Sequence, residues 1–157
     1  MRYFKTVLLL LAVVALSSCK QNDWLDWKIQ NEIWLAQNAQ QDSVFTSASG
    51  LQYKCIFPGH SSSTRPDDSK FVTIQYSGKL INGYEFDSSE SYTDYVNAFV
   101  PGFSEGLKKM HQFAIYEFYI PYYLGYGMNG TGTEGTQSHI PPYSTLIFRV
   151  ELKGINQ

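Results

Sequence analysis

The sequence contains few of the residues on which metal, nucleotide or covalent chemistry usually depends. It has two cysteines and three histidines among 157 residues. The histidines, His60, His111 and His139, lie far apart and have no paired cysteines or carboxylates at ligand spacing, which argues against a zinc site. There is no Gly-x-Ser-x-Gly elbow, and the Gly-Thr-Gly-Thr of residues 130–133 lacks the lysine of a phosphate-binding loop. The sequence therefore points away from zinc enzymes, hydrolases with that elbow and nucleotide-binding proteins.

The apolar run near the start of the chain, residues 7–16, is shorter than the ~20 residues that a membrane-spanning helix needs. Arg2 and Lys5 precede this run and small residues follow it, as in a secretory signal peptide. The run ends in Leu-Ser-Ser-Cys19, which resembles the lipobox of bacterial lipoproteins. That resemblance implies that residues 1–18 are removed and that Cys19 becomes the diacylated first residue of the mature chain. The alternative is an ordinary secreted protein that is cleaved near the same place, with Cys19 free.

Neither sign of charge dominates the sequence. Removal of Arg2 and Lys5 with the signal peptide leaves ten basic and fourteen acidic residues, a net charge of −4. A nucleic-acid-binding domain carries an excess of basic residues, so we expect no nucleic-acid partner.

Cysteine usage predicts no disulfide. If Cys19 is acylated, Cys55 has no partner within the chain. Because Cys55 lies in an apolar stretch, we expect a buried, unreactive thiol on a strand.

Residues 19–50 are expected to form a tether and a helical segment before the main domain. The spacing of Trp27, Ile33 and Trp34 predicts a short helix over roughly residues 24–40. The tryptophans of this segment could pack on the domain, pair with another copy in a homodimer, or rest at a lipid interface, where tryptophan is favoured. Packing on the domain is the default expectation.

Residues 51–157 are expected to form one domain of the α+β class. Apolar and polar residues alternate in four stretches, which predicts half-buried strands over residues 51–57, 71–76, 114–120 and 146–152. The helical signal within this region is residues 101–110, where Phe103, Leu107 and Met110 share a face behind Pro101. A single short helix among antiparallel strands must lie across the sheet to bury both apolar faces.

Several short motifs follow one another from residue 76 to residue 152. They are Tyr76-Ser-Gly78, Gly83-Tyr-Glu-Phe86-Asp87-Ser-Ser, Pro101-Gly-Phe103-Ser-Glu-Gly106-Leu, Tyr126-Gly127 after Pro121, and Ile140-Pro-Pro-Tyr-Ser-Thr-Leu-Ile-Phe148-Arg-Val-Glu-Leu152. Their order and spacing resemble the FKBP-type peptidyl-prolyl cis-trans isomerases. The resemblance implies a strongly curved antiparallel sheet wrapped around one short helix. It also implies an aromatic pocket that needs no metal or cofactor and that binds proline-containing polypeptides.

The same resemblance implies the residues of that pocket. Asp87, Tyr126 and Phe148 would be catalytic, with the Tyr126 hydroxyl donating to a substrate carbonyl. A further aromatic residue is expected from the stretch between Tyr92 and Tyr95, without a choice between its members. Taken singly, each phenylalanine is equally typical of a hydrophobic core. The residues expected to bind substrate are Tyr76, Phe86, Phe99, Val100, Phe103 and Ile140.

Several residues depart from the family pattern, among them Gly125, which stands where alanine is common. Phe103 stands where many members have tryptophan, which makes the pocket floor smaller. Phe113 stands near the place of a common glycine, which affects the start of a strand rather than the pocket. The loop of residues 127–139 is longer than in minimal members and is expected to overhang the pocket.

These observations together predict an isomerase that assists protein folding in the bacterial envelope. We expect it to be anchored by lipid to a membrane, with the outer membrane favoured over the inner. The alternative is a catalytically weak binding module of the same fold, acting as a chaperone or assembly factor. Dimerisation through the N-terminal segment is a further alternative.

Overall fold

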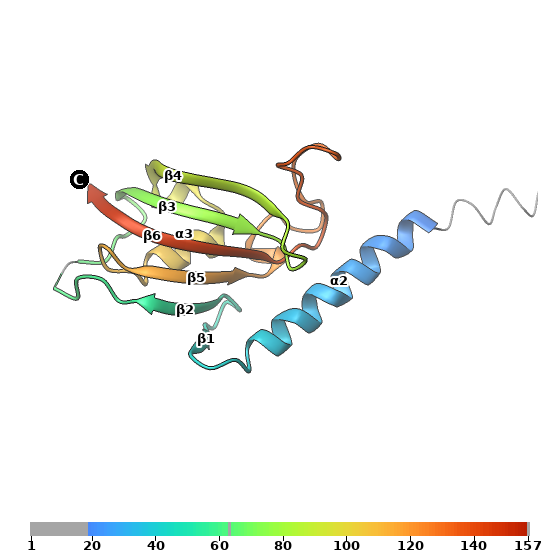
Figure 1. Ribbon diagram of the computed structural model, residues 1–157, viewed down its shortest axis with the longest axis horizontal. Helices are drawn as coiled ribbons and strands as arrows, with labels where there is room; N and C mark the ends of the chain where they lie inside the picture. Colours follow the sequence, from blue (N-terminus) through green and yellow to red (C-terminus); the bar gives the residue numbers. More distant parts are fainter. Residues whose placement is uncertain (1–18, 63, 157) are drawn as a thin grey trace, which may run out of the picture.

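A single antiparallel sheet packed against one short helix forms the body of the protein (Figure 1). The computed structural model describes residues 19–62 and 64–156, so the expected signal peptide lies outside the described residues. The strand order is β1-β2-β5-β6-β3-β4, and the sheet is open at both edges. The strands are β1 (Val44–Thr46), β2 (Gln52–Phe57), β3 (Phe71–Lys79), β4 (Glu85–Tyr95), β5 (Ile115–Ile120) and β6 (Leu146–Asn156).

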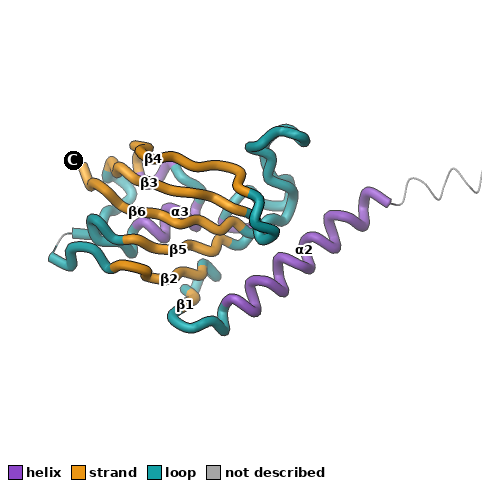
Figure 2. Tube along the Cα trace, in the orientation of Figure 1, coloured by secondary structure: helices purple, strands orange, loops and turns teal. Residues whose placement is uncertain are grey.

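Two α-helices accompany the sheet in the described part of the chain (Figure 2). Two short 3-10 turns lie between the strands. Helix α2 (Cys19–Asn38) precedes the sheet, and helix α3 (Pro101–Leu107) crosses one face of it. The 3-10 turns are η1 (Val96–Ala98), just before α3, and η2 (Tyr122–Leu124), just after β5. This arrangement confirms the predicted α+β class, with a helix before the sheet and a short helix against it.

The alternating pattern of the central strands places the core between the sheet and α3. Leu146, Phe148, Val150 and Leu152 of β6 are all buried, as the period-two pattern requires for one face. Phe103 and Leu107 are buried on the inner face of α3, as predicted. Met110 is also buried, but it follows the helix, which ends at Leu107 instead of continuing to residue 110.

Helix α3 can approach the sheet closely because of a glycine. A methyl group at Gly106 would lie 2.6–2.7 Å from ring carbons of Phe118, so the bare backbone rests directly on that ring. The helix begins with Pro101 at its first position, where proline's missing amide hydrogen costs no helical hydrogen bond.

Helix α2 is attached to the domain by specific polar contacts. Trp27 Nε1 donates to Ser144 Oγ at 3.0 Å, and the Trp34 ring lies 5.8 Å from that of Tyr119. Asn31 is buried; its Oδ1 accepts a 2.7 Å hydrogen bond from the backbone amide of Thr145. Packing of the tryptophans on the domain is therefore confirmed for Trp27 and Trp34.

The structure corrects several expectations for the N-terminal half. Helix α2 starts at Cys19 and ends at Asn38, instead of spanning residues 24–40. Its inner face carries Asn31, whereas Ile33 is exposed. Cys55 lies on β2 as predicted, but it is half-buried instead of buried, and it is a free thiol.

Two strands, β1 and β4, were not predicted at all. Strand β1 has three residues, too few for a pattern. Strand β4 is an edge strand on which Phe86 is the buried residue, so it has no apolar alternation to detect.

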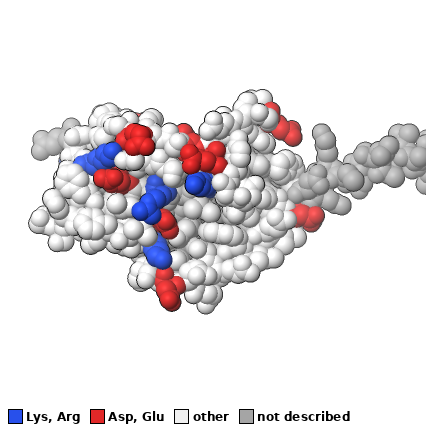
Figure 3. Space-filling model, in the orientation of Figure 1, with Lys and Arg blue, Asp and Glu red and all other residues white. Residues whose placement is uncertain are grey.

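Charges of both signs are interspersed on the face of the molecule shown in Figure 3. Arg149 pairs with Glu117 at 3.3 Å, and Lys79 pairs with Glu85 at 3.7 Å. Within residues 19–62 and 64–156, no helix combines the length and apolar content needed to cross a bilayer.

Candidate functional site

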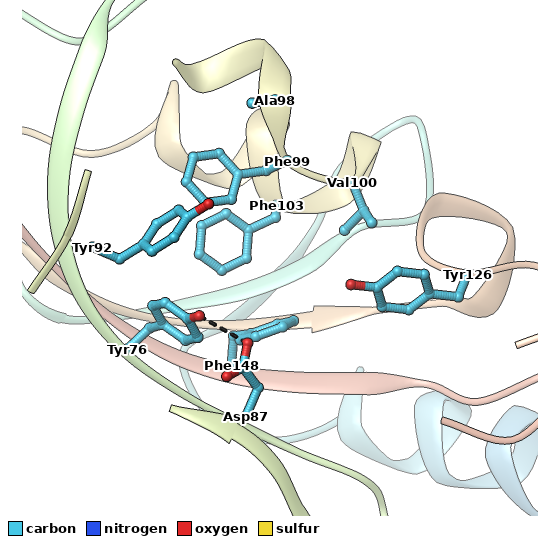
Figure 4. A pocket seen from close by; sticks show the side chains of 9 residues that line it. All are labelled: Tyr76, Asp87, Tyr92, Ala98, Phe99, Val100, Phe103, Tyr126 and Phe148. Atoms are coloured by element: carbon cyan, nitrogen blue, oxygen red, sulfur yellow. Dashed lines mark hydrogen bonds between the residues drawn. The ribbon is translucent and has the colours of Figure 1, made fainter. Parts of the chain in front are cut away.

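A pocket lies between the sheet and the segment that runs from η1 into α3, with a volume of about 280 Å³ (Figure 4). Its walls come from β3, β4, β6, the η1–α3 segment and the loop after η2. The lining residues are Tyr76, Asp87, Tyr92, Ala98, Phe99, Val100, Phe103, Tyr126 and Phe148.

The floor of the pocket is a set of packed aromatic rings. The Phe103 and Phe148 rings meet edge to face, with centroids 4.9 Å apart, and Phe99 stacks on Phe103 at 4.8 Å. The Tyr76 ring meets both Phe103 and Phe148 at about 6 Å. Such edge-to-face and offset contacts are favourable beyond simple burial, so they hold these rings in a defined arrangement.

The polar side-chain atoms of the pocket belong to Tyr76, Asp87, Tyr92 and Tyr126. The Tyr76 hydroxyl donates to Asp87 Oδ2 at 2.8 Å, as the dashed line in Figure 4 marks. Gly78 of β3 stands opposite Asp87 of β4, and Tyr76, two positions before Gly78, lies on the same face of the sheet as Asp87. The Tyr126 hydroxyl is directed from the facing loop toward the pocket interior (Figure 4).

The pocket environment keeps its phenols protonated. Burial, followed by the hydrogen bond to Asp87, raises the pKa of Tyr76 far above its ordinary value. Burial, followed by the negative charge of Asp87, also raises the pKa of Tyr126. Both hydroxyls are therefore protonated at neutral pH, and that of Tyr76 already donates its hydrogen to Asp87.

Gly78 explains the glycine of the Tyr-x-Gly motif. A methyl group at this position would lie 2.6 Å from Phe148 Cε1 and 2.7 Å from Phe86 Cζ. The Phe86 and Phe148 rings lie edge to face at 5.5 Å, so both pack directly on the glycine backbone. Phe148 can therefore occupy its place in the pocket wall only because residue 78 has no side chain.

The sequence matches the family described as FKBP-type peptidyl-prolyl cis-trans isomerase over residues 62–153. The chain belongs to this family. It is similar to the "Probable FKBP-type peptidyl-prolyl cis-trans isomerase FkpA" of Neisseria meningitidis, with 38% identity over 80% of this chain and 45% of that protein. It is also similar to the "FKBP-type 22 kDa peptidyl-prolyl cis-trans isomerase" of Escherichia coli, with 39% identity over 76% of this chain and 56% of that protein.

A solved structure supports the same relationship across nearly the whole chain. The crystal structure of FkpA from Escherichia coli matches with a TM-score of 0.80 and 31% identity, covering 98% of this chain and 71% of that one. The chain spans about half the length of the two curated relatives named above.

Seven of the nine residues expected in the FKBP-type pocket line the cavity together. The two others, Phe86 and Ile140, are buried and do not line it. They contribute to a neighbouring depression whose lining also includes Asp87 and Tyr126, so they lie beside the predicted pocket.

Two lining residues, Tyr92 and Ala98, were not singled out from the sequence. Tyr92 fills the place of the unassigned aromatic residue, with its ring 6.2 Å from Tyr76 and 5.9 Å from Phe99. Tyr95, from the same stretch, packs on Phe71 instead. Ala98 ends the η1 turn and has no side-chain chemistry that a pattern could reveal.

Phe113 adopts a backbone conformation that favours glycine. Phe113 has a φ of 64°, in the left-handed region that glycine adopts without strain. Its ring lies 4.9 Å from that of His60, away from the pocket, as expected for a departure that affects the strand start.

The long loop of residues 127–139 borders the pocket region. An isolated bridge joins Thr131 to Ile140 and closes the base of the loop. Thr131, Gly132 and Ser138 line the neighbouring depression next to Asp87 and Tyr126. The loop thus extends the concave surface beyond the aromatic pocket.

Proposed function

We propose that this protein catalyses cis-trans isomerisation of X–Pro peptide bonds in proteins that fold in the bacterial envelope. The observation that carries the proposal is the aromatic pocket, with Phe103 as its floor and the Tyr76–Asp87 pair on one side. Membership of the FKBP-type isomerase family supports the same activity.

The chemistry needs shape and dryness, with no titrating nucleophile. Rotation about an X–Pro bond faces a barrier of ~18–20 kcal/mol, because the amide loses its resonance as it twists. Water stabilises the planar, charge-separated amide, so a site that excludes water removes that stabilisation. The rings of Phe99, Phe103 and Phe148 form such a surface, and a pocket that fits the twisted amide better than either planar isomer lowers the barrier.

The polar residues orient the substrate in this scheme. The Tyr126 hydroxyl donates to a substrate carbonyl, and Asp87 stands next to the twisting amide. The hydrogen bond from Tyr76 fixes the Asp87 carboxylate, which is otherwise an exposed side chain on an edge strand. Phe86 and Ile140 support the walls from the adjoining depression.

A protease-coupled assay on X–Pro peptides tests the activity, using the chain from residue 20 onward. We expect acceleration at micromolar protein and a clear loss in Asp87→Ala and Phe148→Ala. Glu90→Ala is the matched control, because Glu90 is an exposed carboxylate on the same strand and does not line the pocket. No acceleration by a folded native protein would reject catalysis, and unchanged rates in both pocket variants would show that the site is misplaced.

A second candidate function is a binding module that acts as a chaperone or assembly factor. The depression beside the pocket, formed partly by the long loop, favours this reading because it offers a polypeptide additional surface. Suppression of client aggregation that survives both Asp87→Ala and Phe148→Ala would assign the main role to binding.

The proposed location is the bacterial envelope, with a lipid on Cys19 as the anchor. The Leu-Ser-Ser-Cys19 sequence supports this proposal. One relative, from Legionella longbeachae, is named "Outer membrane protein MIP" and is 33% identical over 83% of this chain and 54% of that protein. Fractionation of cells that produce the native chain or Cys19→Ser tests it: the native chain should remain with membranes and the variant should be released. Equal distribution of the two would reject lipid anchoring.

A further inference from the structure

The amino-terminal end of α2 bears a groove that isomerisation does not use. Its volume is about 420 Å³, and it lies between the first turns of α2, the beginning of the long loop and the segment that follows this loop. Three of its apolar side chains are open to solvent: Trp24 is 36% exposed, Leu25 54% and Met128 63%. The groove is lined by Trp24, Leu25, Lys28, Met128, Pro142 and Tyr143.

We propose that Trp24, Leu25 and Met128 form a membrane-docking tip that enters the interfacial layer of a lipid bilayer when Cys19 is acylated. The inference rests on the proposed lipid anchor and adds a protein surface to it. The lipid alone would leave the domain free to swing, whereas a docked tip fixes how the domain stands on the membrane.

The position of the tip relative to Cys19 carries the argument. Helix α2 begins at Cys19, the residue that would hold the lipid. With a rise of 1.5 Å per residue, Trp24 lies only about 7.5 Å along the helix axis from the anchor, and Leu25 about 9 Å. The interfacial layer is roughly 5–8 Å thick on each side of the hydrocarbon core. Along an upright helix the tip would lie at the outer edge of this layer, and a modest tilt of α2 brings its side chains inside the layer.

The composition of the tip suits a lipid interface. Tryptophan is enriched there because its ring is apolar and its N–H can still bond to water or headgroups. The Lys28 ammonium lies 5.5 Å from the Tyr143 ring centroid and 3.6 Å from Glu32, so its charge is already compensated. Docking should therefore depend on apolar area and little on anionic lipid.

Rigid attachment of α2 makes the tip an orienting device. Trp27 bonds to Ser144, and Asn31 bonds to the amide of Thr145, just before β6. Phe148 of the pocket wall lies on β6, three positions after Thr145. A tip docked at the bilayer thus sets the direction in which the pocket faces.

Fluorescence quenching in vesicles tests the proposal. The acylated mature chain is reconstituted in phosphatidylcholine vesicles whose acyl chains carry bromine, which quenches nearby tryptophan. We expect the native chain to lose about the emission of one tryptophan. Trp24→Phe should reduce this quenching at least threefold, because Trp27 and Trp34 pack on the domain. The double variant Leu25→Gln/Met128→Gln should likewise weaken quenching.

Ile33→Gln is the matched control. Ile33 is also exposed on α2, but it lies about 21 Å along the axis from Cys19 and should not affect quenching. Equal quenching of the native chain and Trp24→Phe, or none in either, overturns the proposal. Absence of quenching together with a dimer that Leu25→Gln dissociates would assign the surface to a second copy and also overturn it.

Two parallel measurements separate this inference from the proposed function. The mass of the purified mature chain reports acylation, and an unmodified Cys19 would refute both the anchor and the docking tip. An acylated chain that shows isomerase activity but no Trp24-dependent quenching would refute the docking tip alone.

Discussion

Substitution of Gly78 by alanine tests how strictly the pocket depends on ring packing. The new methyl carbon would lie 2.6 Å from Phe148 Cε1 and 2.7 Å from Phe86 Cζ. Non-bonded carbons pack at about 3.5–4.0 Å, so one or both rings must move by about 1 Å. Both rings are buried, and Phe148 is already in edge-to-face contact with Phe103, so this movement reaches the pocket floor.

The expected effects differ for stability and activity. Overpacking of a core costs typically 1–3 kcal/mol, so Gly78→Ala should lower the free energy of unfolding by that order. A displacement of about 1 Å near a reacting group can cost up to ~100-fold in rate. We therefore expect kcat/KM for an X–Pro peptide to fall by at least about tenfold, measured on protein that remains folded.

Gly154→Ala supplies the matched control. Gly154 lies on β6 opposite Thr73 of β3, and a methyl group there would meet Thr73 Cβ at an ordinary 3.7 Å. This variant should retain native activity. If Gly78→Ala matched Gly154→Ala in both stability and kcat/KM, the argument from ring packing would be wrong.

Three further predictions concern the polar contacts. Tyr76→Phe keeps the ring but removes the hydrogen-bond donor to Asp87. A net hydrogen bond contributes ~1 kcal/mol, so kcat/KM should fall about fivefold. An unchanged kcat/KM would show that this hydrogen bond is not needed to position the Asp87 carboxylate. Because burial raises the pKa of Tyr76 above 10, its neutral form stabilises the fold fully below pH 10 and this contribution is lost as the pH rises further. Unfolding experiments should show that decline, and a decline of the same size in Tyr76→Phe would contradict its assignment to Tyr76. Asn31→Ala leaves the buried amide of Thr145 unpaired and should lower the free energy of unfolding in urea by about 1–3 kcal/mol. Gln30→Ala, on the exposed face of α2, should lower it little. Equal effects of the two substitutions would mean that this contact does not hold α2.

The central strands could be predicted because their side chains alternate between core and surface. Strand β6 shows this most clearly, since Leu146, Phe148, Val150 and Leu152 share the buried face. Strand β4 escaped prediction because an edge strand is held by backbone pairing to β3 alone, so its exposed polar residues leave no periodic trace. The pattern of the sequence reports burial, and it fails where a strand has little to bury.

The pocket residues that belong to a sequence motif could be predicted, whereas a residue whose orientation depends on strand register could not. Phe99 and Phe103 follow directly from the helix motif, and Phe148 follows from the last strand. Tyr92 depends on irregular pairing between β3 and β4, where the register shifts between Ile74 and Tyr76. A shift of one residue reverses which side chains face the pocket, and no local pattern encodes it.

The attachment of α2 to the domain involves Asn31, whose role could not be predicted from the sequence. Asn31 is polar, yet it is buried because its side chain accepts from the amide of Thr145, 114 positions later. The sequence pattern grouped Ile33 with the tryptophans, but Ile33 faces solvent. Asn31 therefore shares the inner face with Trp27 and Trp34, and its hydrogen bond to Thr145 explains how a polar residue can be buried there.

The most direct measurement of catalysis is NMR exchange spectroscopy on an X–Pro peptide with substoichiometric protein. A catalyst must accelerate the cis-to-trans and trans-to-cis steps equally and leave the equilibrium ratio unchanged. We predict such acceleration with the native chain from residue 20 onward and its loss in Phe148→Ala, whose ring forms a wall of the pocket. Exchange at the uncatalysed rate, with the peptide bound but not interconverted, would contradict isomerase activity and leave a binding module.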